Sequence, residues 1–236
     1  MMFDPSVRRL RRPVAGRLAG IAVECIDGGR VGNVTVRGIR MEGYGTPVFI
    51  RAQRRHEPAS GRSAALRNIL IENVTAVADS RIASSITGVP GLRPRDITLR
   101  GLDLLMPGGG TEEDARRPVP ECERSYPDAH MFGHQALPAY GFYLRHADGV
   151  TFDGVRLMLA APDARERIVV DDCTEIAGLE GRADFPKAPL TWTEPFWYHT
   201  RSFRLDRAHF SCPNGKESTS AGGYGGQEKG KSKCRR

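Results

Sequence analysis

The chain has 236 residues, of which 27% are charged, and its formal net charge is +7. The excess positive charge lies at the two ends, because residues 1–20 and 212–236 each carry a net charge of +4 and the body between them is close to neutral. Nucleic-acid binding, which needs a basic stripe over a folded face, is therefore not predicted, and no apolar run of about 20 residues predicts a membrane span.

Residues 1–19 are predicted to form an irregular basic N-terminus. Their arginines are not followed by the apolar stretch of a signal peptide, so the sequence leaves the cellular location open. The five cysteines are odd in number and form no CxxC pair, which favours neither a disulfide framework nor a zinc site. Neither a metal nor a cofactor is expected.

A short motif recurs along the body of the chain. Each copy has a β-branched segment, a polar dipeptide ending in Gly or Asn, and a second apolar segment. The copies are residues 33–39 (NVTVRGI), 68–74 (NILIENV), 96–102 (DITLRGL) and 149–155 (GVTFDGV), spaced 35, 28 and 53 residues apart. This period is typical of a solenoid, and Gly and Asn tolerate the positive φ of a kink. The alternative is a run of unrelated β-hairpins, although the dipeptide keeps the same offset in every copy.

A further strand is predicted after each copy, and one more before the first copy. These strands are residues 20–24, 47–51, 84–88, 140–146 and 167–172. Three short strands per turn, with kinks between them, predict an all-β fold: a right-handed parallel β-helix over residues 20–181. Between residues 20 and 180 the apolar residues keep no helical period for three turns.

Residues 107–138 fill the long gap between the third and fourth copies. This segment begins with three glycines and is rich in proline, so we expect a loop that walls a cleft or binds a ligand. The glycines lack the following Lys-Ser or Lys-Thr of a phosphate-binding loop. His130 and His134 stand four residues apart, but in a loop this spacing does not predict a metal site.

The C-terminal region departs from the repeat. Residues 182–211 hold seven aromatic residues and are expected to form an irregular extension. This extension could cap the solenoid, stack on sugars or lack a fold of its own. Residues 212–236, rich in Gly, Ser and Lys, are predicted to be a disordered basic tail.

Several segments in combination resemble the later rungs of glycoside hydrolase family 28, the polygalacturonase-like family. They are residues 20–29 (GIAVECIDGG), 47–51 (PVFIR), 84–91 (SSITGVPG), 107–115 (PGGGTEEDA), 119–121 (VPE), 126–127 (YP), 131–133 (MFG) and 137–143 (LPAYGFY). The resemblance implies a pectin-lyase-like β-helix and inverting hydrolysis of pectin-type plant polysaccharide. It also implies a parent enzyme that is secreted or periplasmic.

Inverting hydrolysis needs one carboxylic acid and one carboxylate that activates water. The resemblance implies that these groups come from an Asn-x-Asp element, an Asp-Asp pair and a Gly-His-Gly element, and none of the three precedes Gly20. Asp171 and Asp172 form an Asp-Asp pair, but on the last rung, and Gly133-His134 lacks the second glycine. No catalytic residue is therefore assigned in this chain.

Five residues lie on the strand type that lines the cleft in this family and are predicted to bind substrate: Glu24, Arg51, Tyr143, Arg145 and His146. Many members carry Arg-Ile-Lys where this chain has residues 22–24 (AVE), so we expect a neutral or differently substituted sugar, or carboxylate contacts from another rung. Ordinary alternatives are a solvated Glu24, surface ion pairs of the arginines and half-buried packing of Tyr143. His146 beside Asp148 is either a proton carrier or a plain turn residue.

Three hypotheses follow for function. In the favoured one, the chain is the C-terminal half of a pectin-type glycoside hydrolase, incomplete and inactive alone, because its first rung has no cap and the catalytic rungs are missing. In the second, it is a non-catalytic β-solenoid that binds carbohydrate or packs through its open N-terminal rung against a partner that supplies the other rungs. In the third, it is a small intact enzyme that uses other carboxylates.

Overall fold

The computed structural model describes residues 18–56, 64–133 and 136–179. The predicted extension 182–211, the predicted tail 212–236 and nearly all of the basic N-terminus 1–19 lie outside these ranges. Within them the fold is all-β, with eleven strands and one short helix. No helix in the described ranges is long and apolar enough to cross a membrane.

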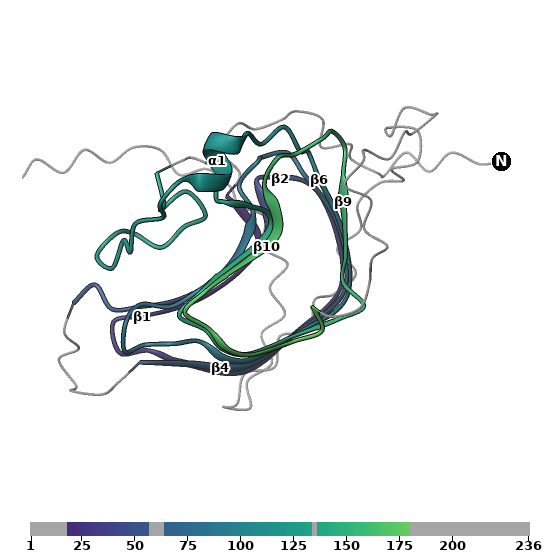
Figure 1. The fold of residues 1–236 in the computed structure, drawn as a ribbon. Coiled ribbons are helices and arrows are strands. Elements are labelled where there is room, and N and C mark those ends of the chain that lie inside the picture. The colour runs from purple at the N-terminus through teal and green to yellow at the C-terminus, as the bar shows by residue number, and fades with distance from the viewer. Residues whose placement is uncertain (1–17, 57–63, 134–135, 180–236) are drawn as a thin grey trace, which may run out of the picture.

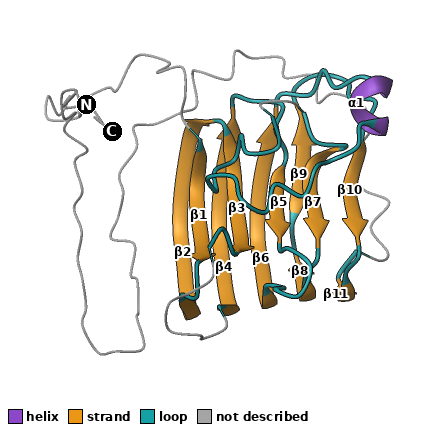
Figure 2. Ribbon diagram, turned by 90° about the vertical axis from the view of Figure 1, so that its left-hand side faces the viewer, coloured by secondary structure: helices purple, strands orange, loops and turns teal. Residues whose placement is uncertain are grey.

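The strands form two parallel sheets, and the chain passes back and forth between them (Figure 1). Sheet A contains β1 (Ala19–Ile26), β3 (Thr46–Gln53), β5 (Ser84–Thr87), β7 (Ala139–Arg145) and β10 (Glu166–Asp171), in this spatial order. Sheet B contains β2 (Arg30–Tyr44), β4 (Ala65–Ala78), β6 (Arg95–Met106), β8 (Asp148–Asp153) and β11 (Thr174–Ala177), with β9 (Arg156–Leu159) also paired to β6. Each pass of the chain thus lies beside the preceding one, a topology consistent with a parallel β-solenoid (Figure 2).

The five strands predicted before the first copy and after each copy are confirmed as β1, β3, β5, β7 and β10. The two halves of each of the first three copies belong to one long strand, whereas in the fourth copy β8 ends at Asp153 and the next strand, β9, begins at Arg156, just after the copy. The predicted kinks are confirmed as well, since Gly38, Asn73, Gly101 and Gly154 have φ values from 55° to 67°. The strand therefore bends at the kink without ending there, except in the fourth copy.

A second bend, which the motif did not predict, stands at the first residue of every copy. Asn33, Asn68, Asp96 and Gly149 have φ values from 55° to 63°. Asn and Asp tolerate this region because their short polar side chains can bond locally. The amide of Asn68 donates to Asn33 Oδ1 at 2.5 Å, which joins the same position in successive turns. Glu175, with φ 57°, occupies the equivalent place in β11, which pairs with β8, so this bend recurs once more after the fourth copy.

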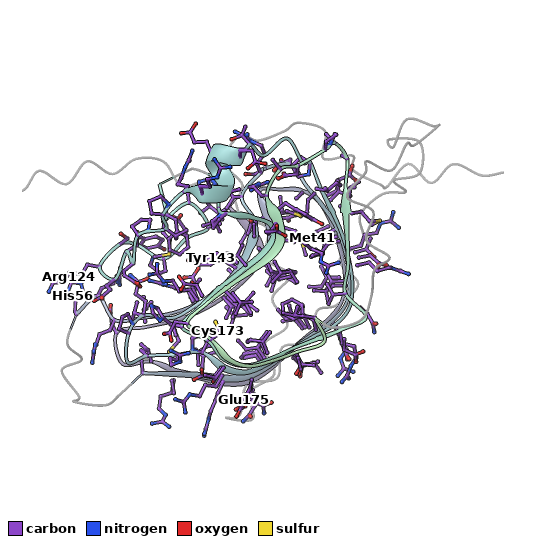
Figure 3. All side chains as sticks on the ribbon, viewed as in Figure 1. Met41, His56, Arg124, Tyr143, Cys173 and Glu175 are labelled. Atoms are coloured by element: carbon purple, nitrogen blue, oxygen red, sulfur yellow. The ribbon has the colours of Figure 1, made fainter. Side chains whose placement is uncertain are left out.

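The apolar core lies between the two sheets, where equivalent positions of successive turns stack (Figure 3). Sheet B stacks Val36, Ile71, Leu99 and Phe152, and sheet A stacks Ile50, Ile86 and Leu144, all of them buried. Burying a side chain of this size stabilises the fold by about 1.5–3 kcal/mol. Each turn therefore depends on its neighbours for its core.

The predicted loop, residues 107–138, leaves the stack after β6, lies beside sheet A and returns at β7 (Figure 1). It contains the helix α1 (Glu112–Arg116), which the sequence did not predict. Thr111 is the N-cap of α1 and forms a capping box with Asp114, because the Asp114 N–H donates to Thr111 Oγ1 and the Thr111 N–H donates to Asp114 Oδ2. Local side-chain bonds thus produce a helix too short for an apolar period.

A buried ion pair between Asp163 and Arg165 holds both ends of this loop. Arg165 Nη2 lies 2.7 Å from Asp163 Oδ2, and the two side chains are 0% and 1% exposed. Asp163 accepts from the N–H of Gly110 at the start of the loop. Arg165 Nη1 donates to three carbonyl oxygens, those of Arg81, Leu137 and Ala139. Gly110 is needed here because a Cβ would lie 2.1 Å from Arg165 Nε.

Candidate functional site

The outer face of sheet A carries a row of polar side chains at one register position. Glu24 is paired with Arg51, Arg51 with Thr87, Thr87 with Arg145, and Arg145 with Asp171. Three of the predicted binding residues, Glu24, Arg51 and Arg145, therefore lie in one row. Thr87 and Asp171 complete the row and were not predicted as binding residues, although they occupy the same place in their turns.

The middle of the loop, residues 119–132, lies against this row and is held there by side chains of β3. Arg51 donates from Nη2 to the carbonyl oxygen of Glu121 at 2.8 Å and from Nη1 to that of Gly88 at 2.6 Å. Gln53 Nε2 donates to three loop carbonyl oxygens at 2.6–3.2 Å, those of Cys122, Glu123 and Ser125. Arg51 is 1% exposed, and burial lowers its pKa to about 10, so it stays charged at neutral pH.

Tyr143 lies under the same part of the loop, on the side of sheet A that faces it (Figure 3). Its ring packs edge-on against Phe132 with centroids 6.5 Å apart, and Arg51 stands 5.7 Å from the Phe132 centroid. Tyr143 is 2% exposed, and burial raises the pKa of its hydroxyl. Arg51 and Tyr143 thus hold the loop in place here, and their contact with a sugar stays a prediction.

Glu121 of the loop is bound by the two remaining predicted residues of β7 and its end. Arg145 Nη2 lies 2.5 Å from Glu121 Oε1, and Arg145 Nη1 donates to the carbonyl oxygen of Val119 at 2.7 Å. His146 Nε2 lies 3.2 Å from both carboxylate oxygens of Glu121. Arg145 and His146, at the C-terminal end of β7, therefore hold one carboxylate together.

The acidic partner of His146 differs from the predicted one. The sequence places Asp148 close to His146 in the chain, but Asp148 is bound by Arg93, whose Nε lies 2.9 Å from each of its carboxylate oxygens. His146 instead places Nδ1 2.5 Å from Asp172 Oδ2. Its φ of 50° ends β7 in a turn, and its ring faces the neighbouring turn of the stack. A contact between turns cannot be predicted from residues adjacent in sequence.

Three carboxylates, Glu121, Asp171 and Asp172, therefore surround Arg145 and His146; we call these five residues the carboxylate cluster. The side chains of the three carboxylates are 34%, 46% and 57% exposed, whereas His146 is 10% exposed. Hydrogen bonds from His146 and Arg93 lower the pKa of Asp172. The cluster thus offers acceptors for hydroxyl groups, and its histidine stands between two carboxylates and can pass a proton between them.

Glu24 lies at the other end of the polar row, on the edge strand β1. Its side chain is half-buried, and burial together with the nearby Asp128 raises its pKa. No group of three or more His, Cys, Asp or Glu in the described part of the chain could hold a metal ion. His134, half of the histidine pair considered above, lies outside the described residues.

We expect Asp172→Asn to lower the free energy of unfolding at pH 7 and to have a progressively smaller effect as the pH falls below about 4. A carboxyl group with a depressed folded pKa stabilises the fold above its unfolded pKa of about 3.9, and this contribution is lost as the pH falls through the folded value. Urea unfolding of both proteins between pH 7 and pH 3 measures the difference. Asp153→Asn is the control, because Asp153 is equally exposed at 57% and binds Arg100 on sheet B. If the unfolding free energies of the wild type and Asp172→Asn changed with pH in parallel, the expectation would be refuted.

Comparison of the chain with family models, with curated proteins and with solved structures found no match. The resemblance to the polygalacturonase-like family therefore rests on the sequence segments quoted above.

Proposed function

We propose that the described residues form the later rungs of a right-handed parallel β-helix of the polygalacturonase-like type. We further propose that they bind pectin-type polysaccharide on the outer face of sheet A and do not cleave it alone. Two features support the β-helix: the alternation of the chain between parallel sheets, and bends that recur at two fixed positions of the repeat. Parallel crossover connections are almost always right-handed.

The carboxylate cluster is the observation that carries saccharide binding. Asp171 and Asp172 reach solvent, yet both are fixed in position: Asp171 by Tyr143 and Arg145, and Asp172 by His146. Exposed carboxylates accept hydrogen bonds from sugar hydroxyls, and a fixed set of acceptors loses little conformational entropy on binding. The long loop stands next to the cluster, as a wall of the binding surface would.

Cleavage by this chain alone would need a protonated carboxyl group and a carboxylate base on opposite sides of a glycosidic bond. Asp172 has a lowered pKa and therefore suits the base, not the acid. Among the described residues, β1 and β2 pair on one side only, so their free edges fit a partner that supplies preceding rungs. Such a partner would also provide the missing catalytic elements.

Calorimetric titration of the purified chain with polygalacturonate and with methyl-esterified pectin tests the proposal, together with an assay for new reducing ends. We expect at least one of the two polymers to bind, with no reducing ends released. The double variant Asp171→Asn, Asp172→Asn should weaken binding at least tenfold, whereas Asp153→Asn on sheet B should not. Failure of both polymers to bind would overturn the proposal, and reducing ends lost in the double variant would establish an intact enzyme instead.

A further inference from the structure

The middle of the loop, residues 119–132, forms two kinds of polar contact with side chains at the outer face and strand ends of sheet A. Most of its contacts are backbone carbonyl oxygens that accept from Arg51, Gln53 and Arg145. The exception is the carboxylate of Glu121, which is bound by Arg145 and His146. The site that holds this carboxylate consists of the Arg145 guanidinium and the His146 ring. The Glu121 side chain is 34% exposed. Another carboxylate could therefore reach the same site from solvent.

Under the loop, two polar atoms of the row are left without hydrogen bonds. Thr87 is 0% exposed, and its hydroxyl has no hydrogen-bond partner among the described residues. The neighbouring Arg145 Nε is also buried and unbonded, although Asp171 Oδ2 lies 3.1 Å from it in a poor direction. Thr87 and Arg145 are register partners on adjacent strands. A buried hydroxyl without a partner is rare in folded proteins, and here it lies beside a site that already takes a carboxylate.

We propose that residues 119–132 are a lid over an anion site formed by Thr87, Arg145 and His146, and that Glu121 occupies this site in place of the ligand. The ligand is a saccharide that carries a carboxylate, which deepens the proposed function and rests on it for the saccharide part. When the ligand binds, its carboxylate replaces that of Glu121 on Arg145 and His146. The loop then moves away, and the Thr87 hydroxyl gains a partner from the ligand.

Glu121→Gln in the full chain tests the lid without any ligand. The amide keeps the shape of the side chain and removes its charge, so its hold on Arg145 and His146 weakens. We expect the backbone amides of residues 119–132 to exchange hydrogen severalfold faster in this variant, measured by mass spectrometry. Glu123→Gln, an exposed position in the same loop, should leave the exchange unchanged. Equal exchange in Glu121→Gln and the wild type would overturn the lid.

Titration with trigalacturonate and with its methyl ester tests the anion site. A competing internal group lowers apparent affinity, so Glu121→Gln should bind trigalacturonate about tenfold more tightly than the wild type. The methyl ester, which lacks the negative charge, should bind equally to both. The proposal would be overturned if Glu121→Gln bound trigalacturonate no more tightly than the wild type does. If polymeric pectin fails to bind but trigalacturonate gains affinity in the variant, the anion site stands and the pectin-binding proposal falls.

Thr87→Val supplies an independent variant that keeps the shape of the side chain. Replacing an unbonded buried hydroxyl by a methyl group should leave the free protein at least as stable. It should also reduce the affinity for trigalacturonate at least threefold, because the ligand loses a hydrogen-bond partner. If Thr87 had only a structural role, Thr87→Val would bind trigalacturonate as tightly as the wild type does. That result would exclude Thr87 from the anion site.

Discussion

Arg165→Met is expected to lower the free energy of unfolding by about 3–5 kcal/mol, the range for removing one partner of a buried ion pair. The variant leaves the Asp163 carboxylate, 0% exposed, without its guanidinium. It also leaves the carbonyl oxygens of Arg81, Leu137 and Ala139 without the donor Nη1. Methionine keeps most of the length of the apolar part of the arginine side chain. The loss of stability therefore comes mainly from the missing charge and hydrogen bonds, and less from lost packing.

The loss should also depend on pH. Burial alone would raise the pKa of Asp163, but hydrogen bonds from Arg165 and Gly110 outweigh burial and lower it. Without Arg165 the burial effect dominates, so Asp163 takes up a proton more readily and the buried charge disappears. The difference in unfolding free energy between the variant and the wild type should therefore shrink as the pH falls. Protonation of Asp163 removes the stabilising ion pair from the wild type, and it removes the unpaired buried charge from the variant.

Urea unfolding of Arg165→Met, Asp163→Asn and the double variant measures the coupling between the two side chains. The double variant should lose much less stability than the two single variants together, because neither charge remains buried. Arg156→Met is the control: Arg156 binds Asp103 through two nitrogens, as Arg165 binds Asp163, but its side chain is 68% exposed. A loss in Arg165→Met no larger than in Arg156→Met would show that the buried pair does not hold the loop.

The alternation of strands between two parallel sheets was predictable from the sequence, because each pass of the chain repeats the same local requirement. Residues 38, 73, 101 and 154 need positive φ, and Gly or Asn stands at each of them. The first bend of each copy is not predictable from the motif, because an Asn, Asp or Gly in front of an apolar segment is equally typical of the start of a strand. The further bend at Glu175 is not predictable in this way, because a glutamate gives no signal for its φ of 57°.

The candidate site was predictable only in part. Register places Glu24, Arg51 and Arg145 in one row, and the repeat offset determines that register. The covering of Arg51 by the loop was not predictable, since it depends on loop backbone carbonyl oxygens, such as that of Glu121, which every residue carries. The contact between His146 and Asp172 joins different turns, and the short spacing of Asp163 and Arg165 resembles an ordinary surface pair.

Phe142→Ala is also expected to lower the free energy of unfolding by about 3–5 kcal/mol, the range for truncating a buried phenylalanine. Phe142 is 0% exposed and lies on β7 of sheet A, while Phe152 lies on β8 of sheet B. Their rings meet edge to face, with centroids 5.3 Å apart and an interplanar angle of 79°. The alanine would therefore remove a contact that joins the two sheets and leave a cavity in the stacked core.

Chemical unfolding measures this loss, with Tyr126→Ala as the control. Tyr126 is 70% exposed and contacts Arg55 through a cation–π interaction worth about 0.5–1 kcal/mol at such a site. Phe142→Leu should recover most of the stability, because it fills most of the volume. Equal losses in Phe142→Ala and Tyr126→Ala would contradict the expectation. Arg145 and His146 follow Phe142 closely at the end of β7, so a cavity at Phe142 should loosen the carboxylate cluster, and saccharide affinity should fall together with stability.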